Sequence, residues 1–250
     1  MSSELISGEG TPEAAWGGWP GLSSLACVAP DAFVPAHSRA VVIAPHPDDE
    51  VLGAGGLLVQ LAGARRRVLL IAVTDGAASH PGSTCWTPTR LTTARHYETT
   101  KALRRLGLNP MLRVRARFPD GAVSQHEAEL AHFIDAYLRP GDVVFTTWRH
   151  DGHPDHEAVG RASAAAARAK GVRLVEYPIW AWHWARPGDT RVPWQRGRRV
   201  LLDRATLQRK RAAVGAFSSQ LEPDSSTGRQ AILARFVLKR LLRPYEVFLL

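Results

Sequence analysis

Residues 40–62 read AVVIAPHPDDEVLGAGGLLVQLA, and this stretch decides the fold class. It begins with an unbroken apolar run, residues 40–44, closed by Pro45, which is typical of a strand buried on both faces. Residues 50–62 then carry apolar side chains at helical spacing. One histidine and three acidic side chains stand at the junction, in residues 45–50. The stretch therefore predicts a strand, a loop rich in ionisable groups and a helix.

The alternation of strand and helix continues along the chain. Further strands are expected at residues 67–74, 112–118, 142–147, 172–177 and 246–250. Helices are expected at residues 89–106, 123–138, 155–170, 204–215 and 228–242. Repeated strand and helix units with short connections imply parallel pairing with right-handed crossovers. The predicted fold is α/β, a Rossmann-like three-layer α/β/α arrangement around a mostly parallel sheet.

The composition is that of an ordinary globular chain, with 250 residues, 45% hydrophobic and 22% charged. This length suits one large α/β domain, which we place at residues 36–250. Residues 1–35 lack clean periodicity and are rich in Gly, Ser, Pro and Ala. We expect them to form an N-terminal arm over the domain, anchored by Trp16 and Trp19.

The charge and the cysteine content limit the class of protein. Arginine and lysine outnumber acidic residues by 32 to 23, a net charge of +9, but a basic average alone is weak support for a nucleic-acid partner, and none is expected. Cys27 and Cys85 form no CxxC pair, which favours a reducing compartment. No apolar run approaches the roughly 20 residues of a membrane span. We expect a cytoplasmic protein whose oligomeric state is open, a homo-oligomer included.

Two clusters of ionisable residues follow predicted strands. The first is the junction at residues 45–50, and the second is HDGHPDHE at residues 150–157, after the strand at 142–147. The carboxyl ends of parallel strands share one edge of a sheet, so both clusters are expected to face one crevice. Asp48, Asp49 and Asp155 could each be a helix-capping residue instead, and either cluster alone fits that interpretation. Together the clusters favour a functional site.

The residue types in these clusters suit a divalent metal. His46, Asp49 and His156 supply two imidazoles and one carboxylate, and a catalytic site commonly has three protein ligands and an open position. Asp48 cannot easily point the same way as its neighbour Asp49, so it is left to act as a general base on metal-bound water. Zinc is the expected metal, although such a site also accepts iron or cobalt.

Two further residues of the second cluster have expected supporting roles. His153 would sit across the substrate as an electrophile or general acid. Asp155 would fix the tautomer of His153.

Both clusters resemble the motifs of the LmbE-like or PIG-L family of metal-dependent de-N-acetylases. The resemblance rests on HPDDEVLGAGG at residues 46–56 and HPDH at residues 153–156. Supporting matches are Thr74-Asp75-Gly76, Arg95 with Glu98, Leu106-Gly107, Ser218-Ser219-Gln220 and Glu246. The resemblance implies the LmbE-like fold and a hydrolase that removes the acetyl group from an N-acetylglucosamine-type unit of a larger glycoconjugate or metabolite.

The same resemblance implies roles for individual residues. His46, Asp49 and His156 would match the zinc ligands, and Asp48 the general base. His153 would help to stabilise the tetrahedral oxyanion, which we expect it to do in its charged form. The partner implied is a small acetylated amino sugar.

Contacts with the substrate are less firmly indicated by the sequence. Asp75 and Arg95 lie where sugar hydroxyls could be held, but Asp75 could be a turn former and Arg95 could pair with Glu98 on a helix surface. Trp182 alternates with Trp180 and Trp184, so in an extended segment the three would share a face and could stack on sugar or cover a hydrophobic aglycone. A core-facing or dimer-forming strand is an equal alternative.

Two other functions compete with deacetylation. A metal-dependent hydrolase of another bond, such as a phosphoester, would suit the arginine excess, but two-metal phosphoesterases usually need more carboxylates. A non-enzymatic basic α/β module that binds nucleic acid would lose affinity steeply with salt and need no metal.

Overall fold

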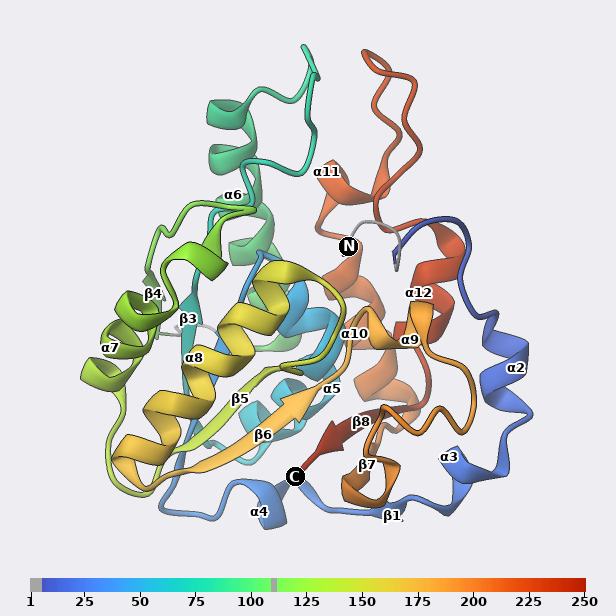
Figure 1. Ribbon diagram of the computed structural model, residues 1–250. Coiled ribbons are helices and arrows are strands. Elements are labelled where there is room, and N and C mark those ends of the chain that lie inside the picture. Colours follow the sequence, from blue (N-terminus) through green and yellow to red (C-terminus); the bar gives the residue numbers. More distant parts are fainter. Residues whose placement is uncertain (1–5, 109–111) are drawn as a thin grey trace.

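A computed structural model describes residues 6–108 and 112–250 of the chain. Its centre is one eight-stranded sheet in the order β1-β7-β8-β6-β5-β2-β3-β4 (Figure 1). Every neighbouring pair is parallel except those made by β8, which runs antiparallel to both β6 and β7. The predicted α/β fold with a mostly parallel sheet is confirmed.

The strands and helices have the following bounds. The strands are β1 (Ala26–Cys27), β2 (Arg39–Ala44), β3 (Arg67–Ala72), β4 (Leu112–Arg115), β5 (Val143–Thr147), β6 (Arg173–Tyr177), β7 (Gly197–Leu201) and β8 (Tyr245–Leu249). The longer helices are α5 (Asp49–Gly63), α6 (Pro88–Leu106), α7 (Glu127–Tyr137), α8 (Pro154–Lys170), α10 (Arg204–Val214) and α12 (Arg235–Leu241). Short helices are α2 (Glu13–Gly17), α3 (Pro20–Ser24), α4 (Pro30–Phe33), α9 (Ala181–Trp184) and α11 (Ser218–Leu221).

The side chains of the central strand β2 show why the sheet is covered by helices on both faces. Its side chains alternate between two apolar cores, with Val41 and Ile43 in one and Ala40 and Val42 in the other. Helices α7 and α8 cover the first face, and α5, α6 and α10 pack together on the second (Figure 1). All six residues of β2 are buried, as a strand covered on both faces requires.

Strand order reverses beside β2, which pairs with β3 on one side and with β5 on the other. In open α/β sheets, ligands bind outside the carboxyl ends of the strands at such a point. The two clusters of ionisable residues follow β2 and β5, so the topology brings them to this crevice.

A buried ion pair holds α5 in place beneath that crevice. The Lys210 ammonium of α10 lies 2.7 Å from the Glu246 carboxylate of β8, and it also donates to the carbonyl of Leu52. Glu246 accepts hydrogen bonds from the backbone N–H groups of Gly56 and Leu57 in α5. These contacts fix the helix that carries the first cluster against the far half of the sheet.

Three expectations for the last third of the chain are wrong. The helix expected at 228–242 begins only at Arg235, because Gly228 has a positive φ of 70° in a turn that the Asp224–Arg229 bridge closes. Strand β7 was not among the strands expected from the sequence. The segment with the alternating tryptophans is the short helix α9 and not an extended strand, so the three indoles do not share one face.

Residues of the N-terminal arm contact the rest of the chain at several places. Trp16 is fully buried, with its ring centroid 5.0 Å from that of Trp182, and Trp19 lies 4.9 Å from Trp194. Strand β1 of the arm pairs with β7 at the edge of the sheet. The first five residues of the arm lie outside the described residues. The boundary at residue 35 stays a prediction.

Gly160 lets α8 lie directly against the chain that leaves β5. A Cβ built at this position would stand 2.8 Å from both Arg149 Cα and Thr147 O, which are backbone atoms that cannot turn aside. We expect Gly160→Ala to lower the free energy of unfolding by about 1–3 kcal/mol, measured by urea denaturation.

Gly63, near the end of α5, is the matched control because nothing lies within 4 Å of its added Cβ. Gly63→Ala should stabilise the protein by up to about 1 kcal/mol through helix propensity. Equal unfolding midpoints for the two variants would contradict the close packing of α8.

No helix within residues 6–108 and 112–250 has both the length and the apolar character that crossing a bilayer demands.

Candidate metal centre and active site

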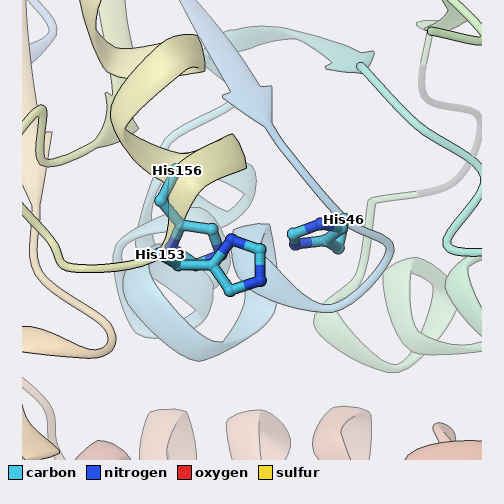
Figure 2. A group of neighbouring side chains, drawn as sticks. All are labelled: His46, His153 and His156. Carbon is cyan, nitrogen blue, oxygen red and sulfur yellow. The ribbon is translucent and has the colours of Figure 1, made fainter. Parts of the chain in front are cut away.

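Three histidines from the two clusters meet at the carboxyl edge of the sheet (Figure 2). His46 stands in the loop after β2, His153 caps the N-terminus of α8, and His156 lies in its first turn. Each offers one ring nitrogen, and these atoms lie within 4.8 Å of one another. Loops more than 100 residues apart in the sequence therefore converge as expected.

Asp49 stands between two of these histidines. Its Oδ2 atom lies 3.2 Å from His46 Nδ1 and 3.2 Å from His156 Nε2. It also accepts a hydrogen bond from the backbone N–H of His46. Nitrogen and oxygen atoms bound tetrahedrally to one zinc ion at about 2.0 Å would be about 3.3 Å apart. The two distances from Asp49 Oδ2 thus have the length that separates neighbouring ligands of a single divalent ion.

The nitrogen of His156 that faces Asp49 supports the same interpretation. Nε2 is buried, yet it has no hydrogen-bond partner of acceptable geometry within the described residues. Leaving a buried polar nitrogen unpaired costs about 1–3 kcal/mol, and coordination to a metal would remove that cost. Two imidazoles and one carboxylate are also the donor types that borderline divalent metals prefer.

A buried carboxylate orients the other ring nitrogen of His156. Asp151 Oδ2 lies 2.8 Å from His156 Nδ1. The same carboxylate accepts hydrogen bonds from the backbone N–H groups of residues 179, 180 and 181, so its position is fixed. A carboxylate behind a ligating histidine sets the tautomer and raises the basicity of the ligand. Sequence reasoning assigned Asp151 no role, although its place in the second cluster was the available signal.

His46 has a corresponding partner, which differs from the one expected. Asp155 Oδ2 lies 3.2 Å from His46 Nε2, and the Asp155 carboxylate accepts from the backbone of Gly121 and Val123. The sequence led us to expect this carboxylate beside His153. Instead, the backbone N–H of Asp155 donates to His153 Nδ1, so the main chain does what the side chain was expected to do.

Asp120, in the loop after β4, is a further residue that sequence reasoning missed. Its Oδ1 atom lies 3.2 Å from His46 Nε2, and its Oδ2 accepts from the backbone N–H of Ala78. His46, Asp120 and Asp155 form a second group with the spacing of a metal site. Asp155 is already engaged by two backbone donors there, which favours the group around Asp49 as the metal centre. The sequence signal for Asp120 is a single aspartate after an arginine-rich strand, which is weak.

Asp48 points away from Asp49, toward α6. Its Oδ2 atom accepts a hydrogen bond of 3.0 Å from Arg95 Nη2, and Arg95 also donates to the carbonyl of Pro47. Asp48 has a φ of 142°, a conformation that L-residues rarely adopt, and such strain concentrates at functional sites. Asp48 makes no capping hydrogen bond, so the simple capping interpretation does not account for it.

Burial raises the pKa of both Asp48 and Glu50. It raises the pKa of Asp48 to about 7, against the opposing charge of Arg95. Burial also raises the pKa of Glu50 to about 8, helped by the negative charge of Asp48. A carboxyl group whose pKa lies near neutrality is suited to take up and return a proton.

The pKa is raised for two of the three histidines and lowered for the third. Burial lowers the pKa of His156, but the charges of Asp49 and Asp151 outweigh it and raise the value to about 9. Burial likewise opposes charge on His46, and contacts with Asp120, Asp155 and Asp49 raise its pKa well above the ordinary value. Burial lowers the pKa of His153 to about 3, with the neighbouring imidazoles adding to the effect.

Of the three residues expected to contact substrate, Arg95 lines the pocket, whereas Asp75 and Trp182 are not among its lining residues in the described chain. Arg95 is buried, lines the pocket and bonds to Asp48, while Glu98 bonds to Ser218 and Ser219, so the two do not form a surface pair. Asp75 forms an ion pair of 2.8 Å with Arg115 and is not among the pocket-lining residues of the described chain. Trp182 packs against Trp16 of the arm, and Trp180 lines the pocket in its place.

A pocket of about 680 Å³ opens above the metal centre. His46, Asp48, Asp49, His153 and His156 all line it. Its volume is in the range of sites that enclose a small molecule. The candidate base, the candidate ligands and the third histidine therefore face one common space.

Comparison with known protein families decides the relationship. The family model PIG-L, described as GlcNAc-PI de-N-acetylase, matches residues 41–167, which is 127 of 250 residues. The chain belongs to the PIG-L family. No curated protein is similar enough to the chain to count as a match.

Solved structures similar to this PIG-L family member include three deacetylases. The A40926 pseudoaglycone deacetylase Dbv21 is 25% identical with a TM-score of 0.59, over 74% of this chain and 83% of that one. A deacetylase from the teicoplanin biosynthesis pathway is 25% identical with a TM-score of 0.57, over 74% and 85%. The N,N'-diacetylchitobiose deacetylase of Pyrococcus horikoshii, at 18% identity and a TM-score of 0.55 over 73% and 70%, shares the fold. The expected LmbE-like fold is confirmed.

Proposed function

We propose that the protein is a metal-dependent de-N-acetylase that removes the acetyl group from an N-acetylglucosamine-type amino sugar within a larger molecule. The observation that carries the proposal is the position of Asp49 Oδ2, 3.2 Å from a nitrogen of His46 and of His156, at the floor of a pocket that Asp48 also lines. Membership of the PIG-L family and the likeness to the glycopeptide deacetylases support the choice of reaction and of substrate.

His46 Nδ1, Asp49 Oδ2 and His156 Nε2 would hold the metal. A divalent ion bound there polarises the amide carbonyl and makes water a stronger nucleophile near neutral pH. Asp151 and Asp155 keep the two imidazoles oriented through their other ring nitrogens. Zinc is the first candidate, with iron and cobalt as alternatives that the same ligands accept.

Asp48 would act as the general base. Its carboxylate takes the proton of the attacking water and later returns it to the leaving amine, so that the amide C–N bond breaks to give acetate and the free amino sugar. Arg95 holds the Asp48 carboxylate at one side of the pocket through its hydrogen bond. The positive charge of a bound metal ion would favour the ionised form of Asp48, and a general base must be ionised when the reaction begins.

His153 would stabilise the oxyanion as a neutral donor. Its Nδ1 atom accepts the backbone N–H of Asp155, which leaves the ring proton on Nε2. Burial opposes a charge on this imidazole, so the charged form expected from the sequence is not needed. An N–H group positioned in advance at the developing negative charge lowers the barrier without reorganisation.

The test is release of acetate from a simple N-acetylglucosaminide by the purified protein. Removal of the metal with a chelator should abolish turnover, and addition of zinc, iron(II) or cobalt should restore it. Persistence of full activity in the metal-free protein would contradict the proposal. A phosphomonoester and a DNA duplex in parallel reactions test the two competing functions directly.

A further inference from the structure

Most of the apolar side chains that line the pocket come from outside the segment that matches the family. The proposed ligands and base lie within residues 41–167. The lining from outside that segment also includes the polar side chains of Gln220 and Arg229. Its apolar side chains come from the arm, from the β6–α9 connection, and from α12 and the segment before it. These side chains are Ile6, Ile179, Trp180, Ile232, Leu233 and Val237.

Sugar hydroxyls do not need such a lining. Three of the six side chains, Ile6, Trp180 and Ile232, are only half-buried, so apolar surface faces the pocket and stays in contact with water. Covering that surface with an apolar group is favourable at about 25 cal/mol per Å². A polar sugar ring alone would leave that gain unused.

The arm is held at this place by buried polar groups. Arg240 of α12 donates to the backbone carbonyls of Glu9 and Thr11, at 2.9 and 2.7 Å. The backbone N–H of Thr11 donates to the carbonyl of His183 at 2.8 Å. Arg240 and His183 are both almost fully buried, so the groups that bind residues 9–11 are held in fixed positions. Figure 1 shows the arm crossing the end of α12 before it turns down to α2.

Gly10 makes this docking possible. It has a φ of 63°, which favours glycine, and a Cβ there would lie 2.6 Å from both His183 Cγ and the His183 carbonyl oxygen. Only a residue without a side chain lets the arm approach α9 so closely. The position of Ile6, four residues earlier, depends on this contact.

We propose that residues 6–11 complete the active-site pocket, and that with the β6–α9 connection, α12 and the segment before α12 they form an apolar wall that binds a hydrophobic group carried by the amino sugar. The inference rests on the proposed deacetylation for its reaction, but not for its binding site. The substrate class is thereby narrowed to N-acetylglucosamine-type sugars linked to an alkyl or aryl group.

The experiment compares methyl, hexyl and phenyl glycosides of N-acetylglucosamine as substrates. The hexyl or the phenyl glycoside should show a KM on the order of tenfold lower than the methyl glycoside. Equal KM values for all three would overturn the inference while leaving the deacetylase function intact.

Two variants test the arm itself. Ile6→Asp places a charge in the wall, and Gly10→Ala displaces the arm without altering a lining side chain. Both should raise KM for the preferred hydrophobic glycoside on the order of tenfold and raise KM for the methyl glycoside by clearly less. A similar loss for the methyl glycoside would show a general folding defect and would contradict the specific role of the arm.

Each variant has a matched control. Leu201→Asp also replaces an apolar residue with a charge, at an exposed position on β7 outside the pocket lining. Gly141→Ala carries the same kind of strain, at a φ of 84°, but its Cβ would meet nothing within 4 Å and it lies outside the pocket lining. Neither control should change KM for any of the three glycosides.

A binding measurement separates the two proposals. Calorimetry with hexyl and methyl glucosaminide, the deacetylated compounds, needs no turnover. Tighter binding of the hexyl compound, lost in Gly10→Ala, supports the apolar wall even if no glycoside is deacetylated. Equal affinities for the two compounds would overturn it even if deacetylation is observed.

Discussion

Replacing Asp48 with Ala should lower kcat for acetate release by about 10²–10⁴-fold, the usual contribution of a positioned general base. Asp48 lines the pocket and contacts none of the nitrogens that surround Asp49, so the metal content should stay at the wild-type value. Steady-state kinetics together with elemental analysis of the purified variant check both halves of this expectation.

An isosteric variant controls for shape. Asp48→Asn keeps the volume of the side chain and removes only its ability to accept a proton, so it should be nearly as inactive as Asp48→Ala. Wild-type turnover in either variant would remove Asp48 from the role of base. Loss of the metal would show instead that Asp48 is a ligand.

Replacing His156 with Ala should abolish both metal binding and activity. The substitution removes one of three proposed ligands and leaves Asp151 buried without its partner. Changing a residue that only supports a ligand typically weakens metal binding 10–100-fold, so losing the ligand itself should cost more than about 100-fold. Metal titration followed by elemental analysis measures this.

His153→Ala is the matched control, because the two histidines lie three residues apart and both line the pocket. His153 belongs to the group of three ring nitrogens that could share an ion, so the comparison is informative. We expect His153→Ala to keep its metal and to lose turnover only. If His153→Ala lost its metal and His156→Ala kept it, His153 would be the ligand and His156 would not.

The sequence predicts well the part of the fold that carries the candidate site, because its strands and helices have clear hydrophobic patterns. Strand β2 is an unbroken apolar run and helix α5 carries apolar side chains at a period of 3.6, and parallel topology then brings the loops after β2 and β5 together. His46, Asp49, His153 and His156 were all expected in one crevice, and the structure places them there.

The supporting residues could not be assigned in the same way. Whether Asp155 serves His46 or His153 depends on the turn of one loop and on the backbone donors of Gly121 and Val123, which no local pattern reveals. Asp120 lies in the loop after β4, a strand that its arginines make hard to recognise. The second half of the chain is also stabilised by tertiary contacts, such as the pairing of β7 with β8, rather than by periodicity.

The tryptophans show how a sound pattern can mislead. Alternation of Trp180, Trp182 and Trp184 fits an extended segment, but the chain forms the helix α9 because Asp151 accepts three consecutive backbone N–H groups at its start. Trp182 then turns to the arm and Trp180 to the pocket. The arm that Trp182 contacts lies outside the part of the chain that matches the family, so the family pattern gives no sign of this contact.

A crystal structure of the metal-loaded protein, with anomalous scattering collected at the absorption edge of the ion, would test the central arrangement most directly. The account predicts one strong peak about 2.0–2.2 Å from His46 Nδ1, Asp49 Oδ2 and His156 Nε2. A peak at Asp120 and Asp155 on the other side of His46, or none at Asp49, would contradict it.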